Sequence, residues 1–457
     1  MRIKEEIKKS GYFWLPSSPQ KRVPGTLTIS DGGMMELEIA GMIENDIASF
    51  LNTSWWDRII GIIEPDQDIT LDGCTPTKKT STSGGISKSL LHIQRAFFGV
   101  AYNEGQDPYF NSFRFSVEGI DEWAEISGIK VDTQLENRAT TISYKQPEDI
   151  LVQLDNGMQL IITFNWTFPG FPRNKEAKVT QKTYFKLVSQ NERKLDEFIS
   201  IAENIATFLC FAINQVACID SMTAFSDNLI RKSQNRETSP IPVDIYTKKW
   251  PFSKDVPKIN PALMLFRFGK IRNDAEIKIN KWIKAYEQTI PAFHLYFWTR
   301  MKVHPYLEAS FLTLAQGLEV LHRRTSDDRV MDESEFEELK NHLIDQCPSE
   351  RRKWLEGKLN HGNEVNLRKR IKSLIEPFKH VFGNSDERNR LIHKIVKIRN
   401  ELTHEASIAN SNEELLSLCD KMELLFELHF LHLISFSQEE IDSIVTDCSD
   451  LQRKLKS

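Results

Sequence analysis

Glycine is unevenly distributed along this chain of 457 residues, and the imbalance divides the sequence into two kinds of structure. Fifteen of the twenty glycines fall within residues 1–190, and five fall within the remaining 267. Glycine is enriched in turns and bulges and is disfavoured inside helices. We therefore expect the first part to be rich in turns and strands and the second part to be helical.

Residue patterning in the first part is typical of β-structure. Thr26–Ser30 and Met35–Ile39 each alternate apolar and polar side chains, and the Asp31-Gly32-Gly33 segment between them favours a hairpin turn. The polar segment 74–85 is expected to be an exposed loop. Runs rich in β-branched and aromatic residues predict further strands at Ile59–Ile63, Ile93–Val100, Ser112–Val117, Thr140–Tyr144, Gln159–Phe164 and Thr183–Leu187.

From about Asn191 the apolar residues recur with the period of a helix. Residues 220–262 contain five prolines and are expected to be irregular. Helices are predicted at about 274–290, 304–325, 333–346, 349–358, 365–376, 385–403, 411–436 and 438–454, with Ser385 and Asn412 among their N-caps. The predicted fold class is α+β, with a β-rich N-terminal domain at 1–190, a helical connector and irregular segment at 191–285, and an all-helical domain at 286–457.

Composition excludes several classes of protein. The chain has 59 Lys and Arg against 64 Asp and Glu, so it is not a globally basic nucleic-acid coat. Six cysteines without a CxxC pair argue against a disulfide scaffold and a zinc ribbon. The charged start, Met1–Ser10, lacks the apolar core of a signal peptide, and the apolar stretch Leu415–Phe436 carries too many ionisable groups for a membrane helix. We expect a cytoplasmic protein with no membrane partner.

Residues 385–404 combine an apolar helical stripe with an excess of basic side chains. Leu391, Ile395, Ile398 and Leu402 recur at spacings of four, three and four residues, as on one helix face. Residues 366–404 contain ten Lys and Arg against four Asp and Glu, although the whole chain is acidic. A basic face of this kind suits RNA phosphate, but a charge run alone is more often a solvated helix surface.

This segment ends in Arg399-Asn400-Glu401-Leu402-Thr403-His404, which has the form R-N-x-x-x-H. These residue types suit RNA cleavage without a metal, in which the 2′-hydroxyl attacks the adjacent phosphorus. Histidine can transfer a proton near neutral pH, arginine can donate to the phosphorane oxygens, and Asn400 can hold the phosphate or orient the imidazole. The other interpretation of His404 is a polar residue that satisfies a carbonyl at the helix end.

The same form occurs eleven residues earlier, in Arg388-Asn389-Arg390-Leu391-Ile392-His393, so spacing alone does not select one pair. Arg388 and His393 lie on one predicted helix, where five residues separate two side chains by about 140° around the axis. Arg399 and His404 are expected to straddle the helix end, where the chain can turn His404 back toward Arg399. Context therefore favours the later pair, and Arg388 with His393 remains the alternative.

Other candidate groups are weaker. Glu319 and His322 lie one helical turn apart, either as a supporting pair beside the motif helix or, more often for such pairs, as a buried polar pair. Cys210 and Cys218 are expected to be core thiols. The chain contains no GxxxxGK[ST], GxGxxG or G-x-S-x-G motif and no convincing set of metal ligands, so we expect no cofactor and no metal site.

Two segments resemble a known family. Ile395–His404 resembles the terminal motif of HEPN ribonucleases, whose all-helical domain carries R-x(4–6)-H, often with a polar residue after the arginine. Tyr306–Arg323 is similar to the first helix of that domain. Gly11-Tyr12-Phe13-Trp14-Leu15-Pro16, together with Pro24–Leu27 and Glu36-Leu37, resembles the start of ApeA-type antiphage proteins, which join a β-rich N-terminal domain to a C-terminal HEPN domain.

The resemblance implies an endoribonuclease of abortive infection whose catalytic residues map to Arg399, Asn400 and His404. HEPN domains usually pair, which implies a homodimer or higher oligomer, and they commonly cut RNA, often tRNA. The N-terminal domain is then expected to sense a phage-derived trigger or to restrain the nuclease. The alternative is a catalytically inactive HEPN-fold protein of a defence or toxin–antitoxin system, whose basic face only docks a partner.

Overall fold

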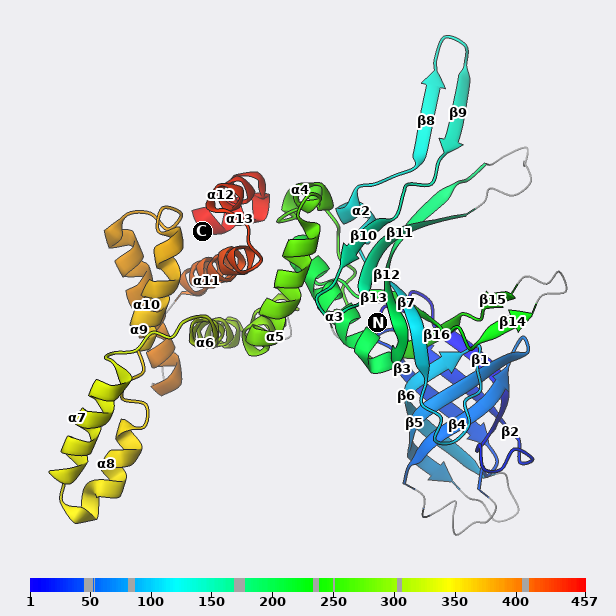
Figure 1. Cartoon of the computed structure of the whole chain (residues 1–457), viewed down its shortest axis with the longest axis horizontal. Coiled ribbons are helices and arrows are strands. Elements are labelled where there is room, and N and C mark those ends of the chain that lie inside the picture. The colour runs from blue at the N-terminus through cyan, green and yellow to red at the C-terminus, as the bar shows by residue number, and fades with distance from the viewer. Residues whose placement is uncertain are drawn as a thin grey trace. The chain divides into compact units, whose positions relative to one another are not determined.

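The computed structural model describes residues 1–44, 52, 54–80, 87–167, 177–232, 238–249, 251–301, 306–404 and 411–457 (Figure 1). The chain divides into two compact units, Met1–Ile283 and Lys284–Ser457, and the boundary falls within helix α5 (Ala275–Arg300). The first unit is rich in strands and the second is helical. The predicted α+β class, with a β-rich N-terminal region followed by a helical C-terminal region, is confirmed. Residues 191–283 belong to the first unit.

Six antiparallel strands at the start of the chain close into a barrel, because β5 and β6 pair with each other as well as with their other neighbours (Figure 1). The predicted hairpin forms β2 and β3. Residues 74–80, expected in a loop, instead extend β5, and residues 81–85 of that predicted loop lie outside the described part. The barrel strands are β1 (Ile7–Trp14), β2 (Val23–Ser30), β3 (Met34–Ala40), β4 (Trp56–Ile63), β5 (Gln67–Thr80) and β6 (Lys88–Phe98).

Glycines allow the barrel strands to coil tightly around the fully buried ring of Phe13. A Cβ atom at Gly25 would lie 3.0 Å from the Phe13 ring, and one at Gly61 would lie 2.8 Å from it. Gly11 pairs with Gly25, and a Cβ at Gly11 would lie 2.2 Å from the carbonyl oxygen of Ile62. Side chains at these positions would therefore push the strands apart.

An open sheet continues from the barrel, because β16 (Val243–Thr247) pairs with the part of β6 that follows its pairing with β3. The order is then β13 (Ile219–Phe225), β7 (Tyr109–Val117), β12 (Thr180–Lys194), β11 (Gln159–Thr167) and β10 (Ile150–Gln153). Helix α3 (Leu195–Ala212) packs on this sheet, where Phe198 stacks on Phe113 with ring centroids 6.1 Å apart. Strands β13 and β16 lie in the segment expected to be irregular.

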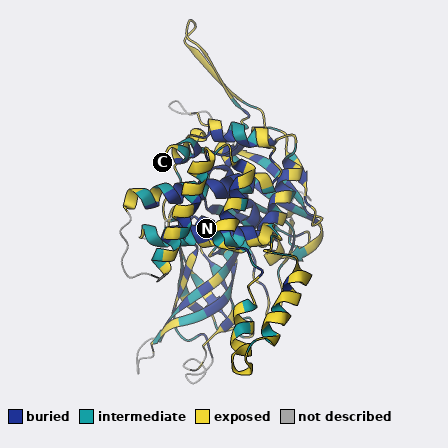
Figure 2. Ribbon diagram, turned by 90° about the vertical axis from the view of Figure 1, so that its left-hand side faces the viewer, coloured by how far each residue is buried: buried dark blue, intermediate teal, exposed yellow. Residues whose placement is uncertain are grey.

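The edge strand of the open sheet is capped by side chains from α5. The backbone N–H of Gln153 donates to Glu276 at 3.0 Å, and the amide of Asn280 donates to the carbonyl of Gln153 at 2.8 Å. A separate hairpin, β8 (Ile129–Gln134) and β9 (Ala139–Tyr144), is exposed along almost its whole length (Figure 2). Because Glu276 and Asn280 occupy the backbone groups of Gln153, the edge strand β10 cannot pair there with another sheet.

The second unit is built from helices, and its predicted helices are confirmed with three differences. The helix expected at 274–290 is α5, which continues to Arg300. One expected helix at 438–454 is two helices, because Cys448 adopts an extended conformation. Asn384 and Ser411, rather than Ser385 and Asn412, accept the first-turn N–H groups of their helices. The helices are α6 (Leu307–Thr325), α7 (Glu333–Asp345), α8 (Arg352–Leu359), α9 (Leu367–Ile375), α10 (Ser385–His404), α11 (Asn412–Leu433), α12 (Gln438–Asp447) and α13 (Ser449–Lys456).

A buried ionic cluster holds α5, α11 and α13 together within this unit. The Lys454 ammonium lies 2.5 Å from Glu427 Oε1 and 3.1 Å from Glu423 Oε2. The hydroxyl of Tyr296 donates to Glu427, and Arg300 pairs with Glu423 at 3.1 Å. Burial by itself would raise the pKa of Glu423, but Lys454 and Arg300 hold that pKa below its ordinary value. Burial instead raises the pKa of Glu427, so the two carboxylates differ, and each member of the cluster depends on its partners.

Substituting Lys454 by Met should destabilise the helical unit strongly. The change leaves Glu427 and Glu423 buried without their shared cation, which typically costs about 3–5 kcal/mol. Urea unfolding of wild type and variant measures the difference. Lys456→Met, at an exposed position two residues away, is the matched control and should change stability little. Equal effects of the two substitutions would contradict the importance of the cluster.

The helical unit should lose stability as the pH falls below 6.5. Burial lowers the pKa of His429 to about 4, although its Nε2–H donates to the carbonyl of Leu374 at 2.7 Å. An unfolded histidine titrates near 6.5, so between pH 6.5 and 4 the unfolded chain binds a proton that the folded chain does not. At about 1.4 kcal/mol per pH unit, His429 contributes a loss of roughly 3 kcal/mol over that window.

Urea unfolding at pH 7 and at pH 4.5 tests this contribution. His429→Gln keeps a donor for the Leu374 carbonyl but cannot titrate, so its stability should fall less between the two pH values than that of wild type. A variant as sensitive to pH as wild type would show that other groups cause the loss.

Candidate functional site

Helix α10 lies against α6 and α9 through one face. Ile392, Ile395 and Ile398 are buried, and Leu391 and Leu402 at the margins are half-buried. The predicted stripe therefore includes the true contact residues Ile395 and Ile398, but the buried face is centred slightly to one side of it. Since this face is fixed by packing, the basic and amide side chains of α10 lie toward its exposed side.

The last turn of α10 carries the R-N-x-x-x-H motif. The half-buried Arg399 donates from Nη1 to Oδ1 of Asn400 at 3.2 Å, and Asn400 is exposed. Thr403 Oγ1 donates to the carbonyl oxygens of Arg399 at 2.8 Å and Asn400 at 3.1 Å, so two carbonyls of the last turn are satisfied. His404 is the last helical residue, and its side chain lies outside the described part of the structure.

The helix continues through both motif residues, which differs from the expectation that Arg399 and His404 straddle its end. Five residues of regular helix place two side chains about 140° apart around the axis. The chain therefore does not turn between Arg399 and His404, and the helix itself does not bring the two positions together.

In the earlier copy of the motif, Arg388 and His393 contact different partners. Arg388 donates from Nη1 to the carbonyl oxygens of Gly383 and, at 3.3 Å, of Lys379, so it secures the loop before α10. His393 lies about two and a half turns of helix beyond Asn384 and contacts Arg368 of α9, with Nδ1 at 3.5 Å from Arg368 Nη2. Arg388 and His393 do not face one another.

Among the described residues, some basic side chains of α9 and α10 form an ion pair with a carboxylate and others do not. Lys394 pairs with Glu414 at 2.6 Å, and Lys397 pairs with Glu401 at 3.5 Å. These are exposed pairs, each of which contributes little to stability and leaves the local excess of positive charge in place. The surface formed by α9 and α10 thus remains suited to a polyanion.

His322, which we considered as a supporting residue, is almost fully buried and belongs to a structural contact between α6 and α9. Its Nδ1 accepts from Arg370 Nη1 at 3.3 Å, and its Nε2 lies 3.3 Å from Asp328. Burial, and then the Arg370 guanidinium, lower the pKa of His322, so it is neutral at pH 7. Glu319 pairs instead with Arg323 at 3.1 Å. Sequence spacing placed Glu319 beside His322 and missed Asp328 and Arg370.

The described residues form neither a metal site nor a membrane-spanning helix. Within the described residues, no group of three or more His, Cys, Asp and Glu side chains is arranged to hold an ion. None of the described helices has the length and apolarity needed to cross a bilayer. Cys210 and Cys218 are buried, as expected, and burial raises the pKa of both thiols.

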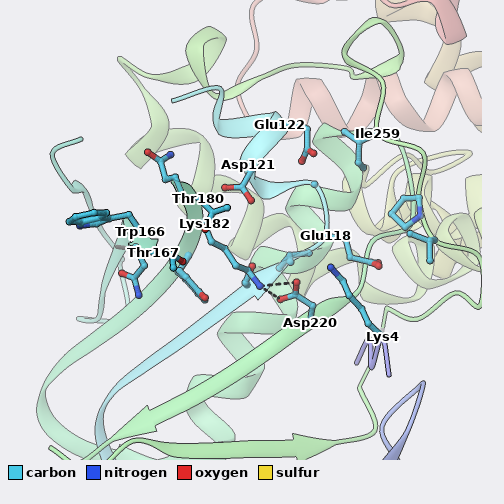
Figure 3. A pocket seen from close by; sticks show the side chains of 18 residues that line it. Lys4, Glu118, Asp121, Glu122, Trp166, Thr167, Thr180, Lys182, Asp220 and Ile259 are labelled. Carbon is cyan, nitrogen blue, oxygen red and sulfur yellow. Dashed lines mark hydrogen bonds and ion pairs between the residues drawn. The ribbon is translucent and has the colours of Figure 1, made fainter. Parts of the chain in front are cut away.

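The N-terminal unit contains a cavity of about 610 Å³ that sequence analysis missed, because its lining comes from several distant segments (Figure 3). The indole of Trp166 lies at one side, and the Lys182 ammonium lies 3.0 Å from the Asp220 carboxylate near the middle of the lining. Asp121 and Glu122 add further carboxylates. The labelled side chains are more acidic than basic, so the cavity is unsuited to phosphate and is distinct in chemistry from the α9–α10 surface.

Comparisons with known proteins identify both units. Residues 8–282 match the family model described as ApeA N-terminal domain 1, and residues 312–440 match the model described as Apea-like HEPN. Neither the curated proteins nor the solved structures gave a match. The second matched range contains α10 with Arg399 and His404, and the first contains the barrel and the open sheet.

The first match alone spans more than half of the chain, and the second places a HEPN domain where the resemblance of the closing motif implied one. HEPN domains are associated with nucleases and with defence. The chain therefore belongs to the ApeA family and joins an ApeA N-terminal domain to a C-terminal HEPN domain.

Proposed function

We propose that this protein is a metal-independent endoribonuclease of antiviral defence, with Arg399, Asn400 and His404 at its active site. The observation that carries the proposal is the contact between Arg399 and Asn400 on the exposed side of α10, within the matched HEPN domain. The unbalanced positive charge of α9 and α10 supports RNA as the substrate class. tRNA is the substrate we would test first.

The chemistry follows from the donors on this helix. The 2′-oxygen forms a bond to the adjacent phosphorus while the bond to the 5′-oxygen breaks. The 2′-hydroxyl proton passes to a base, and the leaving 5′-oxygen receives a proton. Imidazole can perform both transfers, and the Arg399 guanidinium can donate to the phosphorane oxygens as their charge increases. Products are a 2′,3′-cyclic phosphate and a 5′-hydroxyl.

A homodimer explains how one imidazole and one guanidinium can meet at the phosphate. Within one α10 the two positions are about 140° apart, which opposes convergence on a single atom. Two α10 helices placed across a two-fold axis would contribute two histidines, one as base and one as acid, and two arginines. We therefore include self-association, as a dimer or higher oligomer, in the proposal.

The Asn400 side chain is assigned a positioning role. Its Oδ1 accepts from Arg399 Nη1 and so restricts the guanidinium of a long, flexible side chain. Its amide nitrogen can at the same time donate to a phosphate oxygen. The N-terminal unit is proposed to respond to a phage-derived cue and to restrain the nuclease until then, with the protein acting in the cytoplasm.

Arg399→Ala and His404→Ala should each reduce RNA cleavage by at least about 100-fold, since each removes a group that acts in the transition state. Purified protein in chelator, with fragment ends mapped, measures cleavage, and phage challenge measures protection. Arg324→Ala, at an exposed position on α6, is the control for loss of one positive charge.

Three outcomes separate the alternatives. Unchanged cleavage and protection in both variants would reject the proposal. Wild-type protein that binds RNA but yields no cut products would favour an inactive HEPN domain with a docking role. Loss of cleavage in Arg388→Ala alone would favour the earlier motif, although Arg388 is engaged with backbone carbonyls.

Asn400→Asp should lower kcat by roughly 10- to 100-fold, because it places a carboxylate beside the Arg399 guanidinium and near the substrate phosphate. The position is exposed, so the unfolding midpoint should not change. Asn400→Ser, which retains an oxygen able to accept, should lose less activity. Wild-type kcat in Asn400→Asp would show that Asn400 does not position Arg399.

A further inference from the structure

Arg368 and His393 form a contact between the exposed sides of α9 and α10. Arg368 Nη2 lies 3.5 Å from His393 Nδ1, and both residues are exposed. A guanidinium can only donate, so Nδ1 is the acceptor and the ring proton resides on Nε2. The remaining guanidinium N–H groups and the Nε2–H of His393 are then donors available to a ligand.

No described carboxylate balances this pair. Within residues 306–404 and 411–457, no acidic side chain forms an ion pair with Arg368 or His393, whereas the neighbouring Lys394 and Lys397 each have a glutamate partner. A cationic fork with adjacent neutral donors and without a carboxylate has the chemistry of an oxyanion site, because phosphate can accept from both groups at once.

The position of this pair on α10 relates it to the proposed active site. His393 and His404 are eleven residues apart, about three turns of helix, so their Cα atoms lie on the same side of α10, separated by roughly 16 Å. Asn389 and Asn400 have the same relation. Consecutive nucleotides of a stacked strand are separated by about 3.4 Å along the axis, so 16 Å corresponds to about five nucleotides.

We propose that Arg368 and His393 form a second phosphate-binding subsite, which holds the substrate RNA about five nucleotides from the scissile phosphate. The proposal rests on the proposed function, because it takes the end of α10 as the cleavage point. Arg368 and His393 bind the RNA backbone and take no part in bond breaking. The substrate is then a strand that follows α10 along its exposed side.

Substrate length provides the test. After wild-type cleavage has been mapped, one RNA would extend about eight nucleotides on each side of the cut and a second about two. For the long RNA, Arg368→Ala and His393→Ala should raise KM about 10-fold and leave kcat within about twofold. For the short RNA, which cannot reach the subsite, neither variant should differ from wild type. A merely structural role would affect both substrates equally.

Binding measurements make the test independent of catalysis. The long RNA, with a 2′-deoxy nucleotide at the cut, would be titrated at several salt concentrations. Loss of one phosphate contact should reduce the slope of log affinity against log salt by about one in Arg368→Ala, while Arg368→Lys should retain that slope. Arg324→Ala controls for net charge, and unfolding midpoints control for folding.

These experiments distinguish failure of the subsite from failure of the proposed function. If wild-type protein cuts no RNA, the proposed function fails, and a series of uncut RNAs about 6 to 16 nucleotides long still tests the subsite through binding. A reduced affinity confined to the longer RNAs supports it. A loss of kcat on both substrates in His393→Ala would overturn it in favour of catalysis at His393, and unchanged affinity in both variants would also overturn it.

Discussion

Burial of one face of α10 determines where every polar residue of that helix lies. Ile392, Ile395 and Ile398 face α6 and α9, so the helix cannot rotate without exposing apolar surface. His393 and Asn400 are then held on the solvent side. The ionic cluster around Lys454 fixes α11, which in turn contacts α6 and α9, since buried charges tolerate few alternative positions of their helices.

Local pattern was sufficient to predict most elements but not how they pair. Alternation identified β2 and β3, and glycine distribution separated the strand-rich part from the helical part. The polar composition of the segment 74–80 predicts a loop, but its residues form a strand because they pair with β6, which closes the barrel. Strands β13 and β16 were not predicted because their partners β7 and β6 lie far away in sequence. Non-local pairing is not encoded in a short window.

The candidate site likewise contains contacts that the local sequence predicts and contacts that depend on how the helices pack. Arg399 and Asn400 are neighbours in sequence, and their contact follows from local chemistry, so the motif could be singled out before the structure was known. The contact between Arg368 and His393 joins residues 25 positions apart and depends on how α9 packs against α10. His322 was paired by spacing with Glu319, but burial between α6 and α9 gave it Asp328 and Arg370 instead. Spacing on one helix cannot predict what a neighbouring helix contributes.

The repeated R-N-x-x-x-H form on α10 shows how identical residue types acquire different roles from their surroundings. Arg388 follows a turn whose carbonyls lie within reach, so its charge is used to hold the start of the helix. Arg399, in the last turn of the same helix, contacts Asn400. The imidazole of His393 contacts the guanidinium of Arg368, which comes from α9. Among the described residues, no guanidinium from α9 has this position near the end of α10. The three-turn repeat of α10 thus carries two unlike contacts, a guanidinium–imidazole contact between α9 and α10 and a guanidinium–amide contact in its last turn.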